Sequence, residues 1–564
     1  MKVVIIGGVA GGATAAARIR RLDENAEIIV FEKSGFISYA NCGLPYYIGG
    51  VIENKEDLTL QTPESFYSRF RVDMRVHHEV IAIHPEQKTV TVKNLATDED
   101  FEETYDKLLI STGAKPIKPS LEGINKDNIF TLRTVEDTYK IKEYTDINKP
   151  HTAVVAGGGF IGLEVAENLR ELGMEVTIVQ GPAQLMNPYD PDMASFIHAQ
   201  VRSHGIHLLL NHRVTGFEEK DGKTLVQLKN GQALSADMII LAIGVAPDTA
   251  LAKDAGLTLG IKGSIVVNDR METSDPHIYA VGDAVQIKNI ITEKDTLISL
   301  AGPANKQGRI AADNICGRNS RYTGGQGSSV IKIFNLTAAA TGINERIAKD
   351  AGIDFDKVIL SPMSHAGYYP GGKMMTMKVL FEKETYRILG AQIIGYDGVD
   401  KRIDVLATAI RAGIKAYELA ELDLAYAPPY SSAKDPVNMA GFMIENIKNG
   451  IVKQWYYEET DKLPRDGSVT LLDTRTAMEF EHGHIEGFIN IPVDELREHL
   501  KELDKTKPVY LICQSGLRSY IASRILAGNG FDSYNFAGGF RFYDTVHNDR
   551  SLIEKSTACG MDSK

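Results

Sequence analysis

The feature that most constrains the fold of this chain is a glycine-rich turn that occurs twice, at residues 7–12 and 157–162. Each turn follows a short apolar run, at residues 3–6 and 153–156, and precedes a helical pattern. Apolar runs of this length are typical of strands in a parallel sheet that is buried on both faces. Glycines let the backbone approach a pyrophosphate, whose charge also meets the N-terminus of the helix. We therefore predict an α/β fold with two dinucleotide-binding βαβ units.

The first unit carries an acidic residue where a ribose would lie. A helix is predicted over residues 13–22 and a second strand over residues 27–31, and Glu32 closes that strand. An acid about 20 residues after the glycines can bind a ribose hydroxyl. Val9 stands at the middle glycine of the usual G-x-G-x-x-G motif. The candidate nucleotide-binding residues of this unit are Gly7, Gly12 and Glu32.

The second unit has the complete motif in Gly157, Gly159 and Gly162, followed by a strand at residues 176–179. That strand ends at Gln180 and not at an acid, which weakens the usual signal for NAD. No arginine follows within the next twenty residues to hold the 2′-phosphate of NADPH. We predict NADH as the nucleotide, with use of NADPH left open.

Two later segments, at residues 105–114 and 273–284, resemble the remaining FAD-binding parts of flavoproteins with two dinucleotide units. The resemblance places Thr112 and Gly113 at the turn by which the chain leaves the FAD domain. It also implies that Asp283 binds the ribityl chain of FAD. Three matches in this order predict FAD as the first cofactor. Over residues 1 to about 450 the chain resembles the pyridine nucleotide-disulfide oxidoreductase family.

A single cysteine, Cys42, lies just past the first unit in the segment 38–46. The other cysteines are Cys316, Cys513 and Cys559, so Cys42 has no neighbour with which to form a disulfide. Any disulfide at Cys42 must therefore involve a molecule from outside the site. The segment resembles the single-cysteine branch of the family, and within it the coenzyme A-disulfide reductases. In that resemblance Cys42 attacks a CoA disulfide or persulfide.

The resemblance also implies a set of CoA-binding and catalytic residues. It places two active-site tyrosines in the C-terminal dimerisation domain, from which they reach the flavin site of the other subunit of a homodimer. One position that is lysine in some relatives is Phe70 here, and Asn305 and Arg309 are weaker candidates for the same pocket. The implied tyrosines are Tyr368 and Tyr426, and the implied CoA contacts are Thr14, Arg18, Arg21, Ser38, Asn41 and Lys434.

A different cysteine pattern closes the chain. A predicted strand at residues 509–512 runs into Cys513, Gln514, Ser515, Gly516 and Arg518 at the start of a helix. Backbone N–H groups and a helix N-terminus at such a turn lower the pKa of a thiol and hold an anion. Cysteine phosphatases share this spacing, but the segments 473–475, 483–492 and 538–540 resemble a rhodanese domain. His482 and His484 lack further ligands, so no metal site is predicted.

The length of 564 residues exceeds what one core supports, and about three or four domains are expected. The formal net charge of −12 argues against binding to nucleic acid. Four cysteines favour a reducing cytoplasm, and no long apolar run predicts a membrane span. The predicted parts are an FAD domain at 1–115 and 246–325, an NAD(P)H domain at 116–245, an α+β dimerisation domain at 326–450, a linker at 451–460 and a rhodanese domain at 461–564.

Together these resemblances imply a persulfide and polysulfide reductase of the kind in which a CoA-disulfide reductase is fused to a rhodanese. NAD(P)H would reduce CoA disulfide, CoA persulfide or polysulfide through FAD and Cys42, and Cys513 would carry sulfur as a persulfide. One alternative is an NADH oxidase or peroxidase whose cysteine cycles through sulfenic acid. Peroxidases of that group carry a histidine in the first glycine loop, where this chain has Ala10. The other alternative is a flavin redox sensor with a relaying rhodanese.

Overall fold

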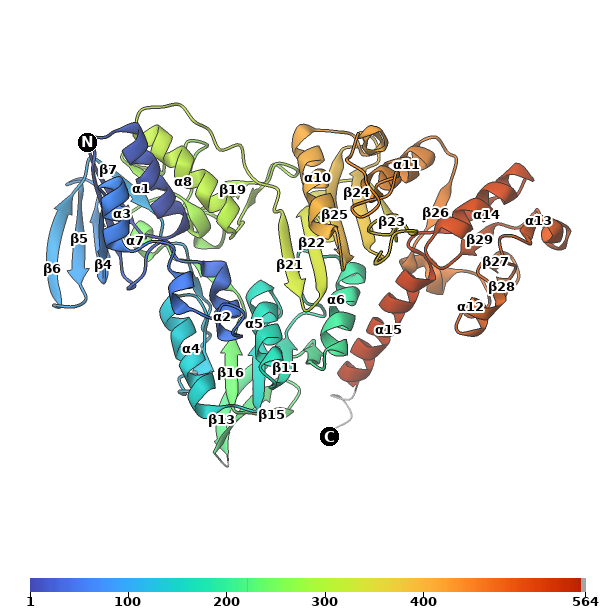
Figure 1. The fold of residues 1–564 in the computed structure, drawn as a ribbon, viewed down its shortest axis with the longest axis horizontal. Coiled ribbons are helices and arrows are strands. Elements are labelled where there is room, and N and C mark those ends of the chain that lie inside the picture. The colour runs from blue at the N-terminus through green and yellow to red at the C-terminus, as the bar shows by residue number, and fades with distance from the viewer. Residues whose placement is uncertain (221, 559–564) are drawn as a thin grey trace. The chain divides into compact units, whose positions relative to one another are not determined.

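The computed structural model describes residues 1–220 and 222–558, which form two compact units. Unit 1 comprises Met1–Ala183 and Gly205–Gln326, and unit 2 comprises Gln184–His204 and the chain from Gly327 onward. Figure 1 follows the chain from blue to red. Cys559 and the last residues of the predicted rhodanese domain lie outside the described residues. No helix in the described ranges is long and apolar enough to span a membrane.

Two parallel sheets of five strands organise unit 1. The first has, in spatial order, β18 (Ile278–Ala280), β7 (Lys107–Ile110), β1 (Lys2–Ile6), β2 (Glu27–Glu32) and β3 (Asp73–Val76). The second has β12 (His207–Leu210), β11 (Glu175–Gln180), β10 (Thr152–Ala156), β16 (Met238–Leu241) and β9 (Ile129–Phe130). The predicted strands of both βαβ units are confirmed.

Each sheet is followed at its glycine turn by a closely packed helix. Helix α1 (Ala10–Leu22) lies beside α8 (Ala301–Ile315), as Figure 1 shows. A Cβ added to Gly12 would lie 1.9 Å from the Gly7 carbonyl oxygen, so only glycine permits this turn. Helix α5 (Phe160–Glu171) repeats the arrangement in the second sheet, where a Cβ on Gly162 would lie 2.1 Å from the Gly157 carbonyl oxygen. The predicted helices after both turns are therefore confirmed.

The remaining elements of unit 1 flank the two parallel sheets. The antiparallel strands are β4 (His78–His84), β5 (Thr89–Asn94), β6 (Glu99–Thr104), β13 (Val214–Lys220), β14 (Lys223–Leu228) and β15 (Ala233–Ala236), with the short pairs β8 (Ala114–Pro116) and β17 (Val245–Pro247), and β19 (Ile287–Lys288) and β20 (Asp295–Thr296). The helices are α2 (Leu44–Ile48), α3 (Pro63–Phe70), α4 (Val135–Asn148) and α7 (Ala250–Asp254).

Unit 2 begins its main part with a five-stranded antiparallel sheet. Its strands are β21 (Ser329–Ile333), β22 (Leu336–Gly342), β25 (Ile388–Gly395), β24 (Thr376–Glu382) and β23 (Phe355–Leu360). Two amphipathic helices cover the sheet and bury an apolar core with it, and a short helix follows β22. These helices are α9 (Glu345–Ala351), α10 (Val399–Ala412) and α11 (Pro436–Lys448).

A five-stranded parallel sheet with helices on it forms the C-terminal part of unit 2. Its strands are β26 (Lys453–Trp455), β30 (Ser533–Phe536), β29 (Val509–Ile512), β27 (Thr470–Asp473) and β28 (Ile489–Asn490). Its helices are α12 (Ala477–Glu481), α13 (Leu496–His499), α14 (Leu517–Gly528) and α15 (Gly539–Ala558). The strands predicted at 469–472 and 509–512 are confirmed. The first strand, β26, lies in the segment predicted as a linker, and the domain boundaries stay a prediction.

Helix α6 (Pro191–Ser203) belongs to unit 2 although the chain on both sides of it belongs to unit 1. It packs against the last helix, α15, through a buried carboxylate, Asp549. His198 Nδ1 lies 2.7 Å and Arg202 Nη1 2.5 Å from this carboxylate. His198 Nε2 accepts a hydrogen bond from the Leu185 N–H, so Nδ1 is the protonated ring nitrogen and donates a hydrogen bond to Asp549. Burial would raise the pKa of Asp549, but His198 and Arg202 outweigh it and lower the pKa.

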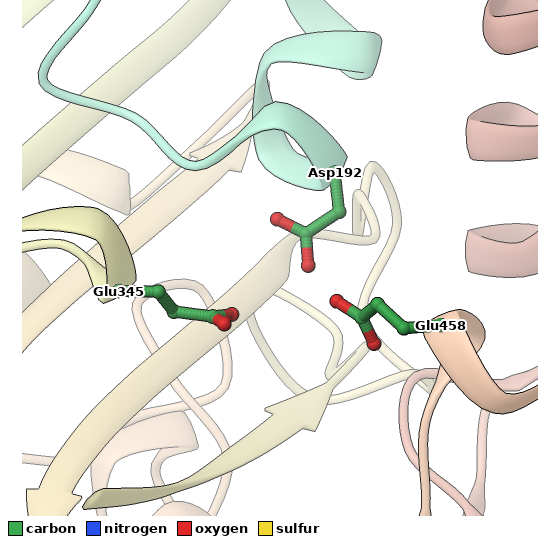
Figure 2. Close-up of side chains that lie close together, drawn as sticks. All are labelled: Asp192, Glu345 and Glu458. Carbon is green, nitrogen blue, oxygen red and sulfur yellow. The ribbon is translucent and has the colours of Figure 1, made fainter. Parts of the chain in front are cut away.

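A second charge cluster, partly buried, involves lysines of the antiparallel sheet of unit 2. Figure 2 shows Asp192, Glu345 and Glu458 pointing toward one another from α6, from α9 and from the segment Tyr457–Lys462. Two ammonium groups already serve these carboxylates. Lys378 Nζ lies 2.8 Å from Asp192 and 2.5 Å from Glu345, and Lys357 Nζ lies 2.7 Å from Glu345 and 3.2 Å from Glu458. The cluster is therefore explained as an ion-pair network without a metal.

Lys378 is the centre of this network and is fully buried in β24. It also contacts Asp190 at 3.0 Å. Burial would lower the pKa of Lys378, but the surrounding carboxylates outweigh burial and raise it. In the same way burial would raise the pKa of Glu345, yet Lys378 and Lys357 hold that pKa at about 2.

Replacing Lys378 with methionine is expected to lower the free energy of unfolding of unit 2 by about 3–5 kcal/mol, because it leaves several buried carboxylates without their cation. The chain's one tryptophan, Trp455, is buried in unit 2, so its fluorescence in a urea titration reports this unfolding. Lys383→Met is the matched control, since Lys383 forms an exposed pair with Asp354 and should change stability by less than about 1 kcal/mol. Equal midpoints for the two variants would contradict the prediction.

Candidate functional site

The first nucleotide site lies at the ends of β1 and β2. The buried Glu32 carboxylate accepts hydrogen bonds from the Gly8 and Ser34 N–H groups, both at 2.9 Å. Helix α1 has no side-chain cap at Val9, so the N–H groups of its first turn are available to a ligand. These groups favour a pyrophosphate, and Glu32 is placed to accept from a ribose. The arrangement fits the nucleotide part of FAD.

The predicted residues Thr112, Gly113 and Asp283 lie near the same sheet edge. Thr112 Oγ1 donates to the Asp248 carbonyl at 2.5 Å, and Gly113 has a φ of +70°. Asp283 Oδ2 accepts from Arg133 Nη2 at 3.3 Å. Burial raises the pKa of Asp283, and Arg133 opposes this shift. Sequence reasoning missed Arg133 because it precedes α4 and carries no motif.

The second nucleotide site repeats the first with one chemical change. The Gly158 N–H donates to Gln180 Oε1 at 2.9 Å, as the Gly8 N–H does to Glu32. Helix α5 starts after Gly159, which provides no side-chain cap. The turn containing Gly157, Gly159 and Gly162 therefore presents the same open helix terminus, which fits a second dinucleotide. The amide of Gln180 replaces a carboxylate at the end of β11.

Cys42 lies in a short 3₁₀ turn, Asn41–Gly43, and is exposed. Partial desolvation by the surrounding protein raises the pKa of its thiol, and the Glu164 carboxylate raises it further, while Arg133 opposes both. Glu164 comes from α5, against which α2 packs. Burial raises the pKa of Glu164 to about 7, with a hydrogen bond from Tyr46 acting the other way. The second nucleotide unit thus places a titratable carboxyl near Cys42, which no motif indicated.

Three of the predicted CoA contacts lie on one face of α1, because Thr14, Arg18 and Arg21 follow helical spacing. Thr14 Oγ1 donates to Asn305 Oδ1 at 2.6 Å, and Arg18 pairs with Asp313 at 2.8 Å. The charge of Arg18 is therefore already balanced by α8, whereas Arg21 is exposed.

The other residues implied for CoA are dispersed. Ser38 has a φ of +45° and donates its N–H to the Gly8 carbonyl, which joins the Cys42 segment to the first glycine turn. Asn41 precedes Cys42 in the 3₁₀ turn. Phe70 packs against Phe66 with tilted rings whose centroids lie 4.8 Å apart, so this position contributes to the core and not to a phosphate contact.

The two predicted tyrosines meet in unit 2. Tyr368 Oη and Tyr426 Oη are 2.6 Å apart, although the residues lie 58 positions apart in the chain. Both side chains are exposed. The hydrogen bond between the two hydroxyls raises the pKa of Tyr426. Lys434 lies exposed in the loop after Tyr426. Unit 2 therefore presents an exposed hydroxyl pair whose two members bond each other.

Cys513 directly follows β29, is fully buried and begins the loop that leads into α14. Its Sγ accepts hydrogen bonds from the Gly516 N–H and from Ser519 Oγ, both at 3.2 Å. Gly516 has a φ of +96°, which turns the loop of Gln514 and Ser515 around the sulfur. Two donors that point at this sulfur fit the anion-holding loop that the cysteine pattern predicts, and that role stays a prediction.

The side of this loop is lined by paired charges. Arg518 forms two 2.7 Å hydrogen bonds with Glu479 of α12, and this contact holds the pKa of Glu479 at about 2. Arg475 is buried, pairs with Asp473 at 2.7 Å and lies over the Phe540 ring. Sequence reasoning identified Arg518 but missed Glu479, whose only signal is its position on a short helix facing the loop.

Two dinucleotide-type turns with an exposed free cysteine near the first are typical of an oxidoreductase, and this chain also carries a cysteine-loop domain. Family models support this class. The model for pyridine nucleotide-disulphide oxidoreductases matches residues 1–308, that for their dimerisation domain residues 328–436, and that for rhodanese-like domains residues 456–544. The chain belongs to the pyridine nucleotide-disulphide oxidoreductase family, whose members depend on FAD and NAD(P)H. The predicted fold class and enzyme class are confirmed.

Individual relatives show which members of the family this chain is similar to. The coenzyme A disulfide reductase of Staphylococcus haemolyticus is 37% identical over 447 residues, which are 79% of this chain and 100% of the relative. The structure described as reduced Bacillus anthracis CoADR-RHD superposes with a TM-score of 0.95 at 50% identity, covering 97% of this chain and 98% of that one. The structure of the NAD-dependent persulfide reductase from A. fulgidus superposes with a TM-score of 0.90 at 38% identity. The superposition covers 96% of this chain and 100% of that one.

Proposed function

We propose that this chain reduces CoA disulfide, CoA persulfide or polysulfide with NADH or NADPH through Cys42, and that Cys513 transfers sulfur. The observation that carries the proposal is the exposed Cys42 beside the first nucleotide site, which forms no disulfide within the described chain. A thiol in this position needs an external sulfur partner. The similarity over nearly the whole chain to a CoADR-RHD and to a persulfide reductase supports CoA and persulfide as that partner.

The chemistry at Cys42 is a thiol–disulfide exchange. The Cys42 thiolate attacks the CoA-bound sulfur of a CoA persulfide, the S–S bond breaks, and hydrosulfide leaves while Cys42 and CoA share a new disulfide. With CoA disulfide the leaving group is CoA thiolate. Bound FAD and NAD(P)H supply the two electrons that return the mixed disulfide to two thiols. The high pKa of Cys42 in this structure means that the thiolate needs a proton acceptor, and Glu164, with a pKa of about 7, is suited to that task.

CoA would be held along α1. Arg21 offers an exposed guanidinium to a phosphate, and Ser38 and Asn41 flank the Cys42 turn. Arg18 would contribute only by exchanging Asp313 for a phosphate. Lys434 would add a cation from unit 2 of the partner subunit in a homodimer, the assembly that the dimerisation domain favours.

The tyrosine pair would donate the proton that the leaving sulfur requires. A hydroxyl that already receives a hydrogen bond is a better placed donor, and Tyr368 and Tyr426 hold each other in position. Because both are exposed on unit 2, we infer that they act on the Cys42 site of the second subunit.

Tyr368→Phe and Tyr426→Phe should each lower the turnover number by up to about 10²–10⁴-fold, because each removes a general acid and keeps the ring. The measurement is steady-state reduction of CoA disulfide over a range of pH. Tyr396→Phe, another exposed tyrosine of unit 2, is the matched control and should retain full activity.

Mixed dimers test whether the tyrosines cross between subunits. Co-expression of Cys42→Ser with a Tyr368→Phe/Tyr426→Phe chain would create dimers in which one complete site combines Cys42 of one chain with the tyrosines of the other. Activity should reappear in these mixed dimers although each parent dimer is inactive. Parents and mixture that are equally inactive would show that each chain uses its own tyrosines.

At the second site, the Cys513 thiolate would attack the sulfane sulfur of thiosulfate or polysulfide, break the S–S bond of the donor and become a persulfide, with sulfite or the shortened polysulfide as the leaving group. The terminal anion of this persulfide would accept hydrogen bonds from the N–H groups of the loop. The loop can then pass that sulfur to a thiol such as CoA, which would supply the Cys42 site. Cys42 and Cys513 must both be thiols to act, and we therefore infer a reducing cytoplasm as the location.

Anaerobic turnover tests the function as a whole. Purified protein should oxidise NADH or NADPH with CoA persulfide, release one hydrosulfide per nucleotide, and show little activity with glutathione disulfide. An NADH oxidase would instead consume oxygen without any thiol substrate; a described water-forming NADH oxidase from Lactobacillus brevis is only 28% identical to this chain. A redox sensor would bind the nucleotide without turnover.

A further inference from the structure

One arginine lies against the end of the second nucleotide unit although it is distant in sequence. Strand β11 ends at Gln180, and Gly181 follows. The next strand of the sheet, β12, ends at Leu210, and its continuation runs beside that point: the His212 N–H donates to the Gln180 carbonyl at 3.0 Å. A Cβ added to Gly181 would lie 3.4 Å from Arg213 Cγ and 3.5 Å from Arg213 Nε. The stem of Arg213 therefore covers Gly181.

Arg213 is an exposed residue, and its side chain forms no salt bridge or hydrogen bond with any residue of the described ranges. A second cation is close in the backbone, because the Lys229 N–H donates to the Arg213 carbonyl at 2.8 Å and Lys229 is also exposed. The side chain that ends β11 is the neutral amide of Gln180, which bonds the Gly158 N–H. The end of this strand thus presents positive charge and no carboxylate.

The equivalent position in the first βαβ unit, at the end of β2, carries the opposite charge. There Glu32 ends the strand and bonds the Gly8 N–H at the same distance of 2.9 Å. In a Rossmann unit this position meets the adenosine ribose: an acid binds the 2′-hydroxyl of NADH and repels a 2′-phosphate, whereas an arginine accommodates the phosphate. A guanidinium can bind a phosphate through two parallel N–H bonds.

We propose that Arg213, together with the neutral Gln180, forms a subsite for the 2′-phosphate of NADPH, so that the chain uses NADPH at least as well as NADH. The inference deepens the proposed function by specifying its electron donor and rests on the dependence of the family on NAD(P)H. Sequence reasoning favoured NADH because it sought an arginine within the twenty residues after β11. The fold supplies the arginine from beyond the neighbouring strand.

Ligand binding tests the subsite without any sulfur substrate. Binding of 2′,5′-ADP and of 5′-AMP to the FAD-loaded dimer is measured by calorimetry. Arg213→Gln should lower the affinity for 2′,5′-ADP by about tenfold or more, because a charge-assisted hydrogen bond is lost. The affinity for 5′-AMP should not change. The ratio of kcat/KM for NADPH and NADH, measured with ferricyanide as acceptor, should fall by a similar factor.

Gln180→Glu is the complementary variant. The Glu32–Gly8 contact shows that a carboxylate fits this position, so the variant should fold and should select NADH over NADPH. Arg318→Gln, which removes an exposed arginine elsewhere in unit 1, should alter neither ligand. If Arg213→Gln lowered the affinity for 2′,5′-ADP and for 5′-AMP equally, the proposal would be wrong, and the guanidinium would instead stack on the adenine ring that both ligands share. Unchanged binding of 2′,5′-ADP would overturn it outright, and either result leaves the chemistry of Cys42 untouched.

Discussion

Serine in place of Cys42 is expected to lower the rate of CoA disulfide and CoA persulfide reduction by on the order of 10⁴- to 10⁶-fold, the loss seen when a covalent nucleophile is removed. A serine hydroxyl cannot form the mixed disulfide with CoA. In the described part of the chain no hydrogen bond joins the Cys42 thiol to the nucleotide turns, so FAD should remain bound. Stopped-flow measurement of flavin reduction by NADH or NADPH tests whether FAD is still bound. The disappearance of CoA persulfide, measured on the same enzyme, tests whether the sulfur chemistry is lost.

Cys316→Ser is the matched control for this experiment. Cys316 is a half-buried free thiol of the same unit, and burial raises its pKa as it does that of Cys42. The control should retain full activity. A Cys42→Ser enzyme that reduces CoA persulfide near the normal rate would show that the sulfur chemistry takes place elsewhere.

Alanine in place of Cys513 is expected to end the transfer of sulfur from thiosulfate or polysulfide, since the Gly516 and Ser519 donors would surround no sulfur. Reduction of CoA persulfide should survive, because that reaction needs only Cys42, the tyrosine pair and the bound cofactors. Reduction of donors too bulky for the CoA site should fall. Sulfur transfer is measured as thiocyanate formation, and reduction as nucleotide oxidation, on the same preparation.

The Cys42→Ser enzyme serves as the reciprocal control, because it should lose reduction and keep sulfur transfer. A Cys513→Ala enzyme that is equally impaired on every substrate would refute this division of labour. In that case Cys513 would belong to the reductase cycle itself.

Local sequence predicted the parts of the sites that local backbone geometry creates. The glycine turns, Glu32 and the loop after Cys513 each lie within one strand–turn–helix segment, so the spacing of residues sufficed. Tyr368 and Tyr426 were predicted only through resemblance to a family, because nothing in two separate loops indicates a 2.6 Å contact.

Residues that reach a site from another element could not be predicted in this way. Arg133 approaches Asp283, Glu479 approaches Arg518, and Glu164 comes near Cys42 only after sheets and helices have packed. Lys378 is the clearest example. A lysine within the apolar strand β24 would be expected to face outward, and only the fold shows that carboxylates of α6 and α9 surround it.

The contact between α6 and α15 has a consequence for biosynthesis. His198 and its partner Asp549 are 351 residues apart, and at about 5–20 residues per second the ribosome needs roughly 20–70 s to make the second after the first. Unit 1 is complete once Gln326 has emerged, whereas α6 waits for the last helix of the chain. The nascent protein therefore holds a finished unit 1 while the side of α6 that packs on α15 is still uncovered, and unit 2 closes only after α15 has been made.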